Sequence, residues 1–157
     1  MDTEHSELPD AGDAGEAGDA GEAGEARESA YALLQRGLGL IRGRHYAQAA
    51  IVLERAARRE PGKGSILEAL GRACYNSGQH DLARGAFEAL LRVDPSSGYG
   101  HYALGQALKQ LGRPGEARTH LRLAVALDPA SALYAGALRR LGPLGQDRSV
   151  TRPEPEG

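Results

Sequence analysis

The chain has 157 residues, enough for one domain, and its composition favours helices. It contains 27 Ala and 21 Leu but only 3 Ile and 4 Val. Because β-branched residues favour strands, this ratio argues against a β-sandwich or a doubly wound sheet. The single Cys excludes an intrachain disulfide. There is no apolar run of about 18 residues and the N-terminus is acidic, so we expect a cytoplasmic protein that does not contact membranes.

The charge is unevenly distributed along the chain. Residues 2–28 hold ten acidic residues and one Arg, whereas residues 29–157 hold 18 basic and 11 acidic residues. Residues 11–26 repeat Ala, Gly and an acid, without a large apolar side chain, so we expect residues 1–29 to form a disordered acidic arm. The arm is either a solubilising tail or a pseudo-ligand for the basic body. Residues 143–157 are also expected to be unstructured.

A 34-residue period organises the rest of the chain. It relates the proline column at positions 61, 95 and 129, the glycine column at 37, 71 and 105, the alanine column at 49, 83 and 117, and the apolar column at 53, 87 and 121. Two helical apolar stripes per period predict helix–turn–helix units over 30–63, 64–97 and 98–131. The second helices should end near Asp94 and Asp128, before the prolines. We also expect Ser65 and Glu68 to form a capping box.

These columns resemble the tetratricopeptide repeat, a helix–turn–helix unit of 34 residues. The resemblance covers residues 30–142 and implies an all-α solenoid of three repeats. Residues 132–141 are similar to the extra helix that caps such arrays. Arg36 occupies a core position of the first repeat, which leaves the order of that repeat open. His101 occupies another core position, where it is either buried and neutral or turned to solvent.

No motif suggests catalysis or metal binding. None of the five His has a partner at a metal-ligand spacing, and residues 62–65 are a turn rather than a phosphate loop. Cys74 falls at a core position and is expected to be a small buried hydrophobe. We therefore expect no enzyme activity and no cofactor.

The resemblance also implies a concave groove lined by the first helices of the repeats. At those positions this sequence has aromatic, basic and amide side chains, which suit contact area, carboxylates and an extended backbone, respectively. They are Tyr31, Gln35, Arg42, Arg72, Tyr75, Asn76, Tyr99, Tyr102, Gln106, Lys109, Gln110 and Arg140. Some of the tyrosines are alternatively packing residues between repeats. The basic and amide clamp with which some relatives hold a C-terminal carboxylate is absent.

We therefore expect a non-catalytic interaction module that binds an acidic segment of a partner protein, and the arm either competes for the groove or serves only as a solubilising tail. One alternative is a self-associating structural subunit that stacks through residues 132–141 or through the first repeat. Another is nucleic-acid binding by the basic body, although the arginines are scattered and the acidic arm would repel phosphates. The sequence leaves the oligomeric state open.

Overall fold

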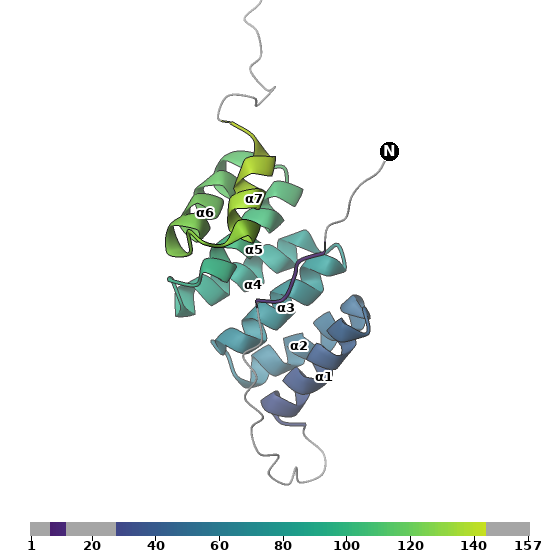
Figure 1. Ribbon diagram of the computed structural model, residues 1–157. Coiled ribbons are helices and arrows are strands. Elements are labelled where there is room, and N and C mark those ends of the chain that lie inside the picture. The colour runs from purple at the N-terminus through teal and green to yellow at the C-terminus, as the bar shows by residue number, and fades with distance from the viewer. Residues whose placement is uncertain (1–6, 12–27, 144–157) are drawn as a thin grey trace, which may run out of the picture.

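The computed structural model describes residues 7–11 and 28–143 (Figure 1). Its helices are α1 (Ala30–Arg42), α2 (Tyr46–Arg59), α3 (Gly64–Asn76), α4 (His80–Val93), α5 (Gly98–Gln110), α6 (Pro114–Leu127) and α7 (Ala132–Leu141). The predictions for residues 1–6, 12–27 and 144–157, most of the acidic arm and the C-terminal tail, lie outside the described residues. Within the described ranges, each helix is too short or too polar to cross a membrane.

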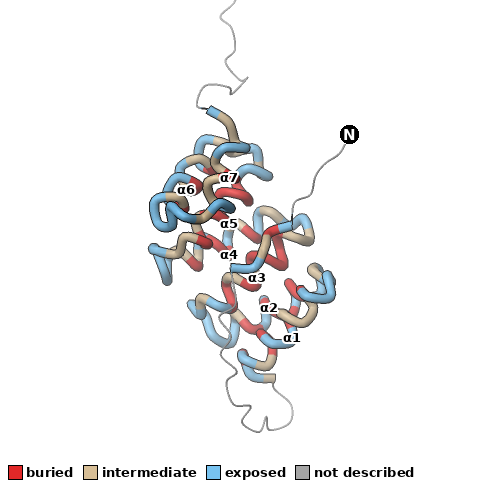
Figure 2. The backbone as a smooth tube through the Cα atoms, viewed as in Figure 1, coloured by how far each residue is buried: buried red, intermediate tan, exposed pale blue. Residues whose placement is uncertain are grey.

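Small residues let the two helices of each pair pack closely. Leu53, Phe87 and Leu121 are fully buried, each against the glycine of the partner helix. Ala49, Ala83 and Ala117 are also fully buried. A Cβ atom built on Gly71 would lie only 2.4 Å from Cε1 of Phe87. The glycine, alanine and apolar columns of the sequence are therefore the residues through which the two helices of each pair pack. Figure 2 shows buried residues recurring along the helices.

Helix ends follow the predicted boundaries with one exception. Asp94 and Asp128 are the C-cap residues of α4 and α6, as the following prolines predict. The hydroxyls of Ser29, Ser97 and Ser131 cap α1, α5 and α7 by accepting backbone N–H groups. The predicted capping box of Ser65 and Glu68 is wrong. Helix α3 begins at Gly64 with Lys63 as its N-cap, so Ser65 lies inside the first turn.

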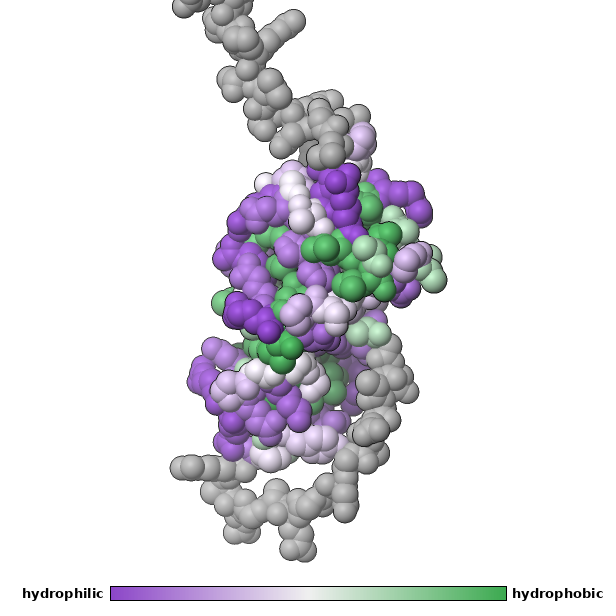
Figure 3. Space-filling view, turned by 90° about the vertical axis from the view of Figure 1, so that its left-hand side faces the viewer, coloured by the Kyte–Doolittle hydropathy of each residue, from purple (hydrophilic) through white to green (hydrophobic). Residues whose placement is uncertain are grey.

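The helix pairs stack into a curved array. The backbones of α1, α3, α5 and α7 approach one another in turn, whereas those of α2, α4 and α6 stay farther apart. The odd-numbered helices therefore form the inner, concave side, and the even-numbered helices form the outer side. Large exposed hydrophobic residues concentrate on the outer helices, namely Ile51, Leu82, Val93, Leu123 and Leu127. In the side view of Figure 3, hydrophobic patches lie among hydrophilic surface.

The first repeat forms a regular helix pair despite Arg36. The side chain of Arg36 is exposed and pairs with Glu28 at 2.8 Å. One repeat later, the equivalent residue Leu70 faces α2 of the preceding repeat. Because no described repeat precedes the first one, Arg36 occupies a site that faces solvent, and a charge there leaves the packing intact.

Candidate functional site

A short N-terminal segment, residues 7–11, lies across α3 on the concave side (Figure 1, purple). Leu8 is 4% exposed and belongs to the hydrophobic core cluster. Its backbone N–H donates to Oδ1 of Asn76 at 2.9 Å. The hydroxyl of Tyr99 donates to the carbonyl oxygen of Pro9, also at 2.9 Å. The segment is thus held through its main chain by the end of α3 and the start of α5.

Two carboxylates of the segment meet arginines. Asp10 accepts from Nη1 of Arg72 at 3.2 Å, and Glu7 accepts from Nη2 of Arg44. Arg72 is 7% exposed, so its charge has little access to water. Burial raises the pKa of the neighbouring Glu68, Arg72 opposes this rise and Asp10 adds to it. The buried guanidinium therefore lies in the field of two carboxylates, one of them from the N-terminal segment.

Tyr99, which bonds to this segment, belongs to a row of packed tyrosine rings. The rings of Tyr99 and Tyr102 lie 6.0 Å apart, and Tyr102 stacks on Tyr134 of α7 at 5.3 Å. Burial raises the pKa of Tyr99 well above 10, so its hydroxyl keeps the proton that it donates to Pro9. The tyrosines thus pack between repeats and also present polar atoms to the groove, combining the two interpretations of the sequence.

The structure brings only part of the predicted set to the segment. Three of the twelve residues, Arg72, Asn76 and Tyr99, bond to it. Gln110 donates to the hydroxyl of Tyr75 at 3.4 Å, and Gln106 is buried. The remaining residues except Tyr102 are exposed: Tyr31, Gln35 and Arg42 on α1, Lys109 on α5 and Arg140 on α7.

Sequence reasoning missed Arg44 and Tyr46, which meet Glu7. Burial raises the pKa of Tyr46, and the carboxylate of Glu7 raises it further. Arg44 has a φ of 62°, in the left-handed region, and the residues one and two periods later are Gly78 and Gly112, with φ of 82° and 73°. A side chain in that region costs about 1–2 kcal/mol. Arg44 thus replaces the glycine that the later repeats have at this left-handed position, and this departure in the sequence could have marked it as a functional residue.

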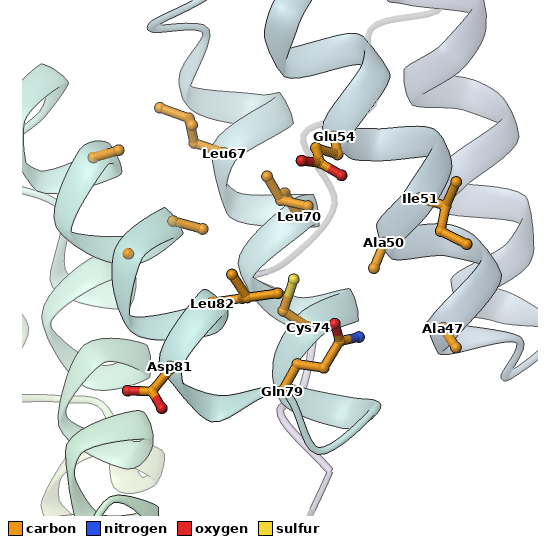
Figure 4. Close-up of a pocket in the computed structure, with 13 residues that line it drawn as sticks. Ala47, Ala50, Ile51, Glu54, Leu67, Leu70, Cys74, Gln79, Asp81 and Leu82 are labelled. Carbon is orange, nitrogen blue, oxygen red and sulfur yellow. The ribbon is translucent and has the colours of Figure 1, made fainter.

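An apolar depression of about 500 Å³ lies on the outer side between α2 and α4 (Figure 4). Its lining is mainly apolar and includes Ile51, Leu70 and Leu82. The thiol of Cys74 lies at its floor, and burial raises the pKa of this thiol to about 11. The thiol is therefore neutral near pH 7 and a poor nucleophile, as expected for a packing residue.

The two central histidines have a structural role. Nδ1 of His101 lies 3.0 Å from Nδ1 of His120, and Nε2 of His101 lies 2.9 Å from the carbonyl oxygen of Pro95. Because a carbonyl only accepts, His101 carries its proton on Nε2, and His120 donates to Nδ1 of His101. Across the described ranges, no cluster of His, Cys, Asp and Glu could hold a metal ion.

The fold has relatives among solved structures. The first tetratricopeptide repeat domain of Spaghetti bound to the HSP90 peptide SRMEEVD is 16% identical, with 72% of this chain and 90% of that chain covered and a TM-score of 0.69. MamA from Desulfovibrio magneticus is 23% identical over 72% and 64% of the chains, with a TM-score of 0.69. The Yersinia enterocolitica secretion chaperone SycD, in complex with a peptide of the translocator YopD, is 19% identical over 69% and 88%, with a TM-score of 0.64.

Sequence comparison identifies the family. No curated protein matches the sequence. A tetratricopeptide repeat profile matches residues 34–84 and 68–132, which together are more than half of the chain. These matches coincide with the helix pairs and with the columns of small residues between them. The chain therefore belongs to the tetratricopeptide repeat family.

Proposed function

We propose that this chain is a non-catalytic protein-interaction module whose concave groove binds an extended, acidic segment of a partner protein. We also propose that residues 7–11 regulate the module by occupying the groove in cis. The observation that carries both proposals is the contact set of that segment: a main-chain N–H, a main-chain carbonyl and a carboxylate each have a groove partner. The peptides in the Spaghetti and SycD complexes support a peptide-binding role.

The charge of the solenoid favours an acidic partner. Residues 29–145 hold 16 basic and 8 acidic residues, a net charge of +8. Arg72 and Arg44 both pair with exposed carboxylates of the segment; the guanidinium of Arg72 is buried and that of Arg44 is exposed. Exposed pairs are screened by salt, so the affinity for an acidic peptide should fall as ionic strength rises.

The tethered segment competes with an external peptide through its high effective concentration. A segment joined to the groove by a short stretch of chain is present at about millimolar effective concentration. If its intrinsic dissociation constant is about 100 µM, an external peptide binds the intact chain about tenfold more weakly than a chain whose segment has been released. Such a penalty suppresses weak ligands and allows strong ones to bind.

A self-associating structural subunit is the second candidate. It is supported by the apolar depression on the outer side, whose rim includes the exposed residues Ile51 and Leu82, and by Leu133, which is exposed on α7. Sedimentation of the full chain separates the two candidates, since only self-association gives a mass that rises with protein concentration.

The proposal is tested with an opened variant of the full chain, Leu8→Ser/Asp10→Ser, which removes the buried side chain and the carboxylate of the segment. Both positions lie outside the helices, so the solenoid should be retained, as circular dichroism would show. A random peptide library is selected on the opened variant, and the affinities of the selected peptides are measured. We expect about tenfold weaker binding to the unmodified chain, and weaker binding at high salt.

Two further variants locate the binding site. Tyr99→Phe in the opened variant removes the hydroxyl donor of the groove and should weaken the selected peptides. Leu82→Ser, on the outer side, should leave them unchanged. Peptides that respond to Leu82→Ser and not to Tyr99→Phe would mean that the groove is not the binding site.

A further inference from the structure

We infer that the groove reads a short pattern, acid–Leu–Pro–acid, on an extended partner segment, with residues 7–10 as the internal copy of that pattern. The inference rests on the proposed function and specifies its ligand. Each of the four residues Glu7, Leu8, Pro9 and Asp10 meets a different group of the solenoid, which gives the pattern its order.

The second position requires an apolar side chain. Leu8 is 4% exposed although it lies outside every helix, and it joins the core cluster that the repeats share. Glu7 and Asp10 are exposed and Pro9 is half-buried, so Leu8 is the most deeply inserted residue of the segment. Truncating such a leucine to alanine weakens binding by about tenfold or more.

The main-chain contacts fix the direction of the segment. Asn76 accepts the N–H of the second residue, and Tyr99 donates to the carbonyl of the third. A reversed chain would present these main-chain groups in the opposite order. Proline suits the third position because it has no N–H to satisfy and because it holds the preceding residue in an extended conformation.

The two acidic positions are read with unequal strength. At the fourth position, Asp10 meets the buried Arg72. The Nε atom of Arg72 is also buried and has no hydrogen-bond partner among the described residues. A neutral residue in place of Asp10 would leave this buried guanidinium without a charged partner from the segment, even where a neutral oxygen still accepts a hydrogen bond. At the first position, Glu7 meets Arg44, and both side chains are exposed. The fourth position should therefore discriminate more strongly than the first.

A labelled peptide, Ser-Glu-Leu-Pro-Asp-Ala with blocked ends, tests this pattern on the opened full chain by fluorescence anisotropy. We expect saturable binding that is weakened about tenfold or more by Leu→Ala, about tenfold by Asp→Asn and less than about fivefold by Glu→Gln. The reversed peptide, which has the same composition and charge, is the matched control and should not bind. Equal binding of the forward and reversed peptides, or of the Leu→Ala peptide, would overturn the inference.

A variant of the protein assigns the acidic position. In the opened chain carrying Arg72→Gln, the effect of Asp→Asn in the peptide should disappear, while the effect of Leu→Ala should persist. An unchanged Asp→Asn effect in this variant would contradict the role of Arg72. Library peptides that bind through Tyr99 but lack the pattern would leave the proposed function standing and refute this inference. A library with no binders would refute both.

Discussion

At the scale of single residues, two glycines of the second repeat have opposite surroundings. Gly71 in α3 faces the ring of Phe87, which is fully buried, and an added Cβ would lie 2.4 Å from it. Gly85 in α4 is exposed, and an added Cβ would meet nothing within 4 Å. Replacement by alanine therefore tests helix propensity alone at Gly85, whereas at Gly71 the gain in helix propensity is opposed by a clash with Phe87.

We predict that Gly71→Ala destabilises the protein by about 1–2 kcal/mol, because overpacking outweighs the gain in helix propensity. Gly85→Ala should instead stabilise it by up to about 1 kcal/mol. Urea denaturation followed by circular dichroism gives both free energies of unfolding. A stabilised Gly71→Ala variant would show that Phe87 can move away and that the close approach of α3 and α4 is not required.

At the scale of helices, α5 and α6 are joined by the two histidines as well as by apolar packing. Burial lowers the pKa of His120 from 6.5, His101 lowers it further, and Glu116 and Glu88 oppose this. The folded chain therefore binds this proton less readily than the unfolded chain does. The contribution of His120 to stability is complete above pH 6.5, the pKa of the unfolded chain. It is lost as the pH falls from 6.5 through the lower pKa of His120 in the folded chain.

We predict that the melting temperature falls when the pH is lowered from about 7.5 to about 5. The variant His120→Gln should show a smaller decrease over the same range, the remainder coming from other titrating groups. Identical pH profiles for the two proteins would mean that His120 has the same pKa in the folded chain as in the unfolded chain.

How far the sequence predicts this structure differs between helices and groove. The helix pairs could be predicted because the glycine, alanine and proline columns recur in every repeat, as at Gly71, Ala83 and Pro95. The start of α3 could not, because Lys63 stands where α1, α5 and α7 have a capping serine. In the groove, Arg72, Asn76 and Tyr99 follow from the repeat register. The binding of Leu8 to the solenoid could not be predicted from the repeat register, because it depends on a contact between residues 68 positions apart.

At the scale of the whole molecule, α7 closes one end of the array. Ala137 is 3% exposed, and Tyr134 stacks on Tyr102, so α7 covers apolar surface of the third repeat. In a repeat protein each unit is stabilised mainly by its neighbours. Damage to α7 should therefore weaken the adjacent helices most and the first repeat least.

We predict that Ala137→Asp, which buries a charge, costs more than about 2 kcal/mol. Hydrogen exchange should accelerate in α5 and α6 more than in α1. The matched control is Ala132→Asp, at an exposed position in the first turn of α7, where an acidic residue interacts favourably with the helix dipole. Uniform acceleration along the chain would mean that the solenoid unfolds as a single cooperative unit.

The segment of residues 7–11 also has a mechanical consequence. It bonds to Arg44 in the first repeat, to Asn76 in the second and to Tyr99 at the start of the third. In an array whose units otherwise touch mainly their neighbours, this segment connects the inner sides of all three repeats. Exchanging the segment for a ligand with a different spacing between its contacts would change the radius of the curved array. If the segment is displaced as proposed, the outer faces of the repeats would then turn relative to one another, and occupancy of the groove would alter the shape of the opposite surface.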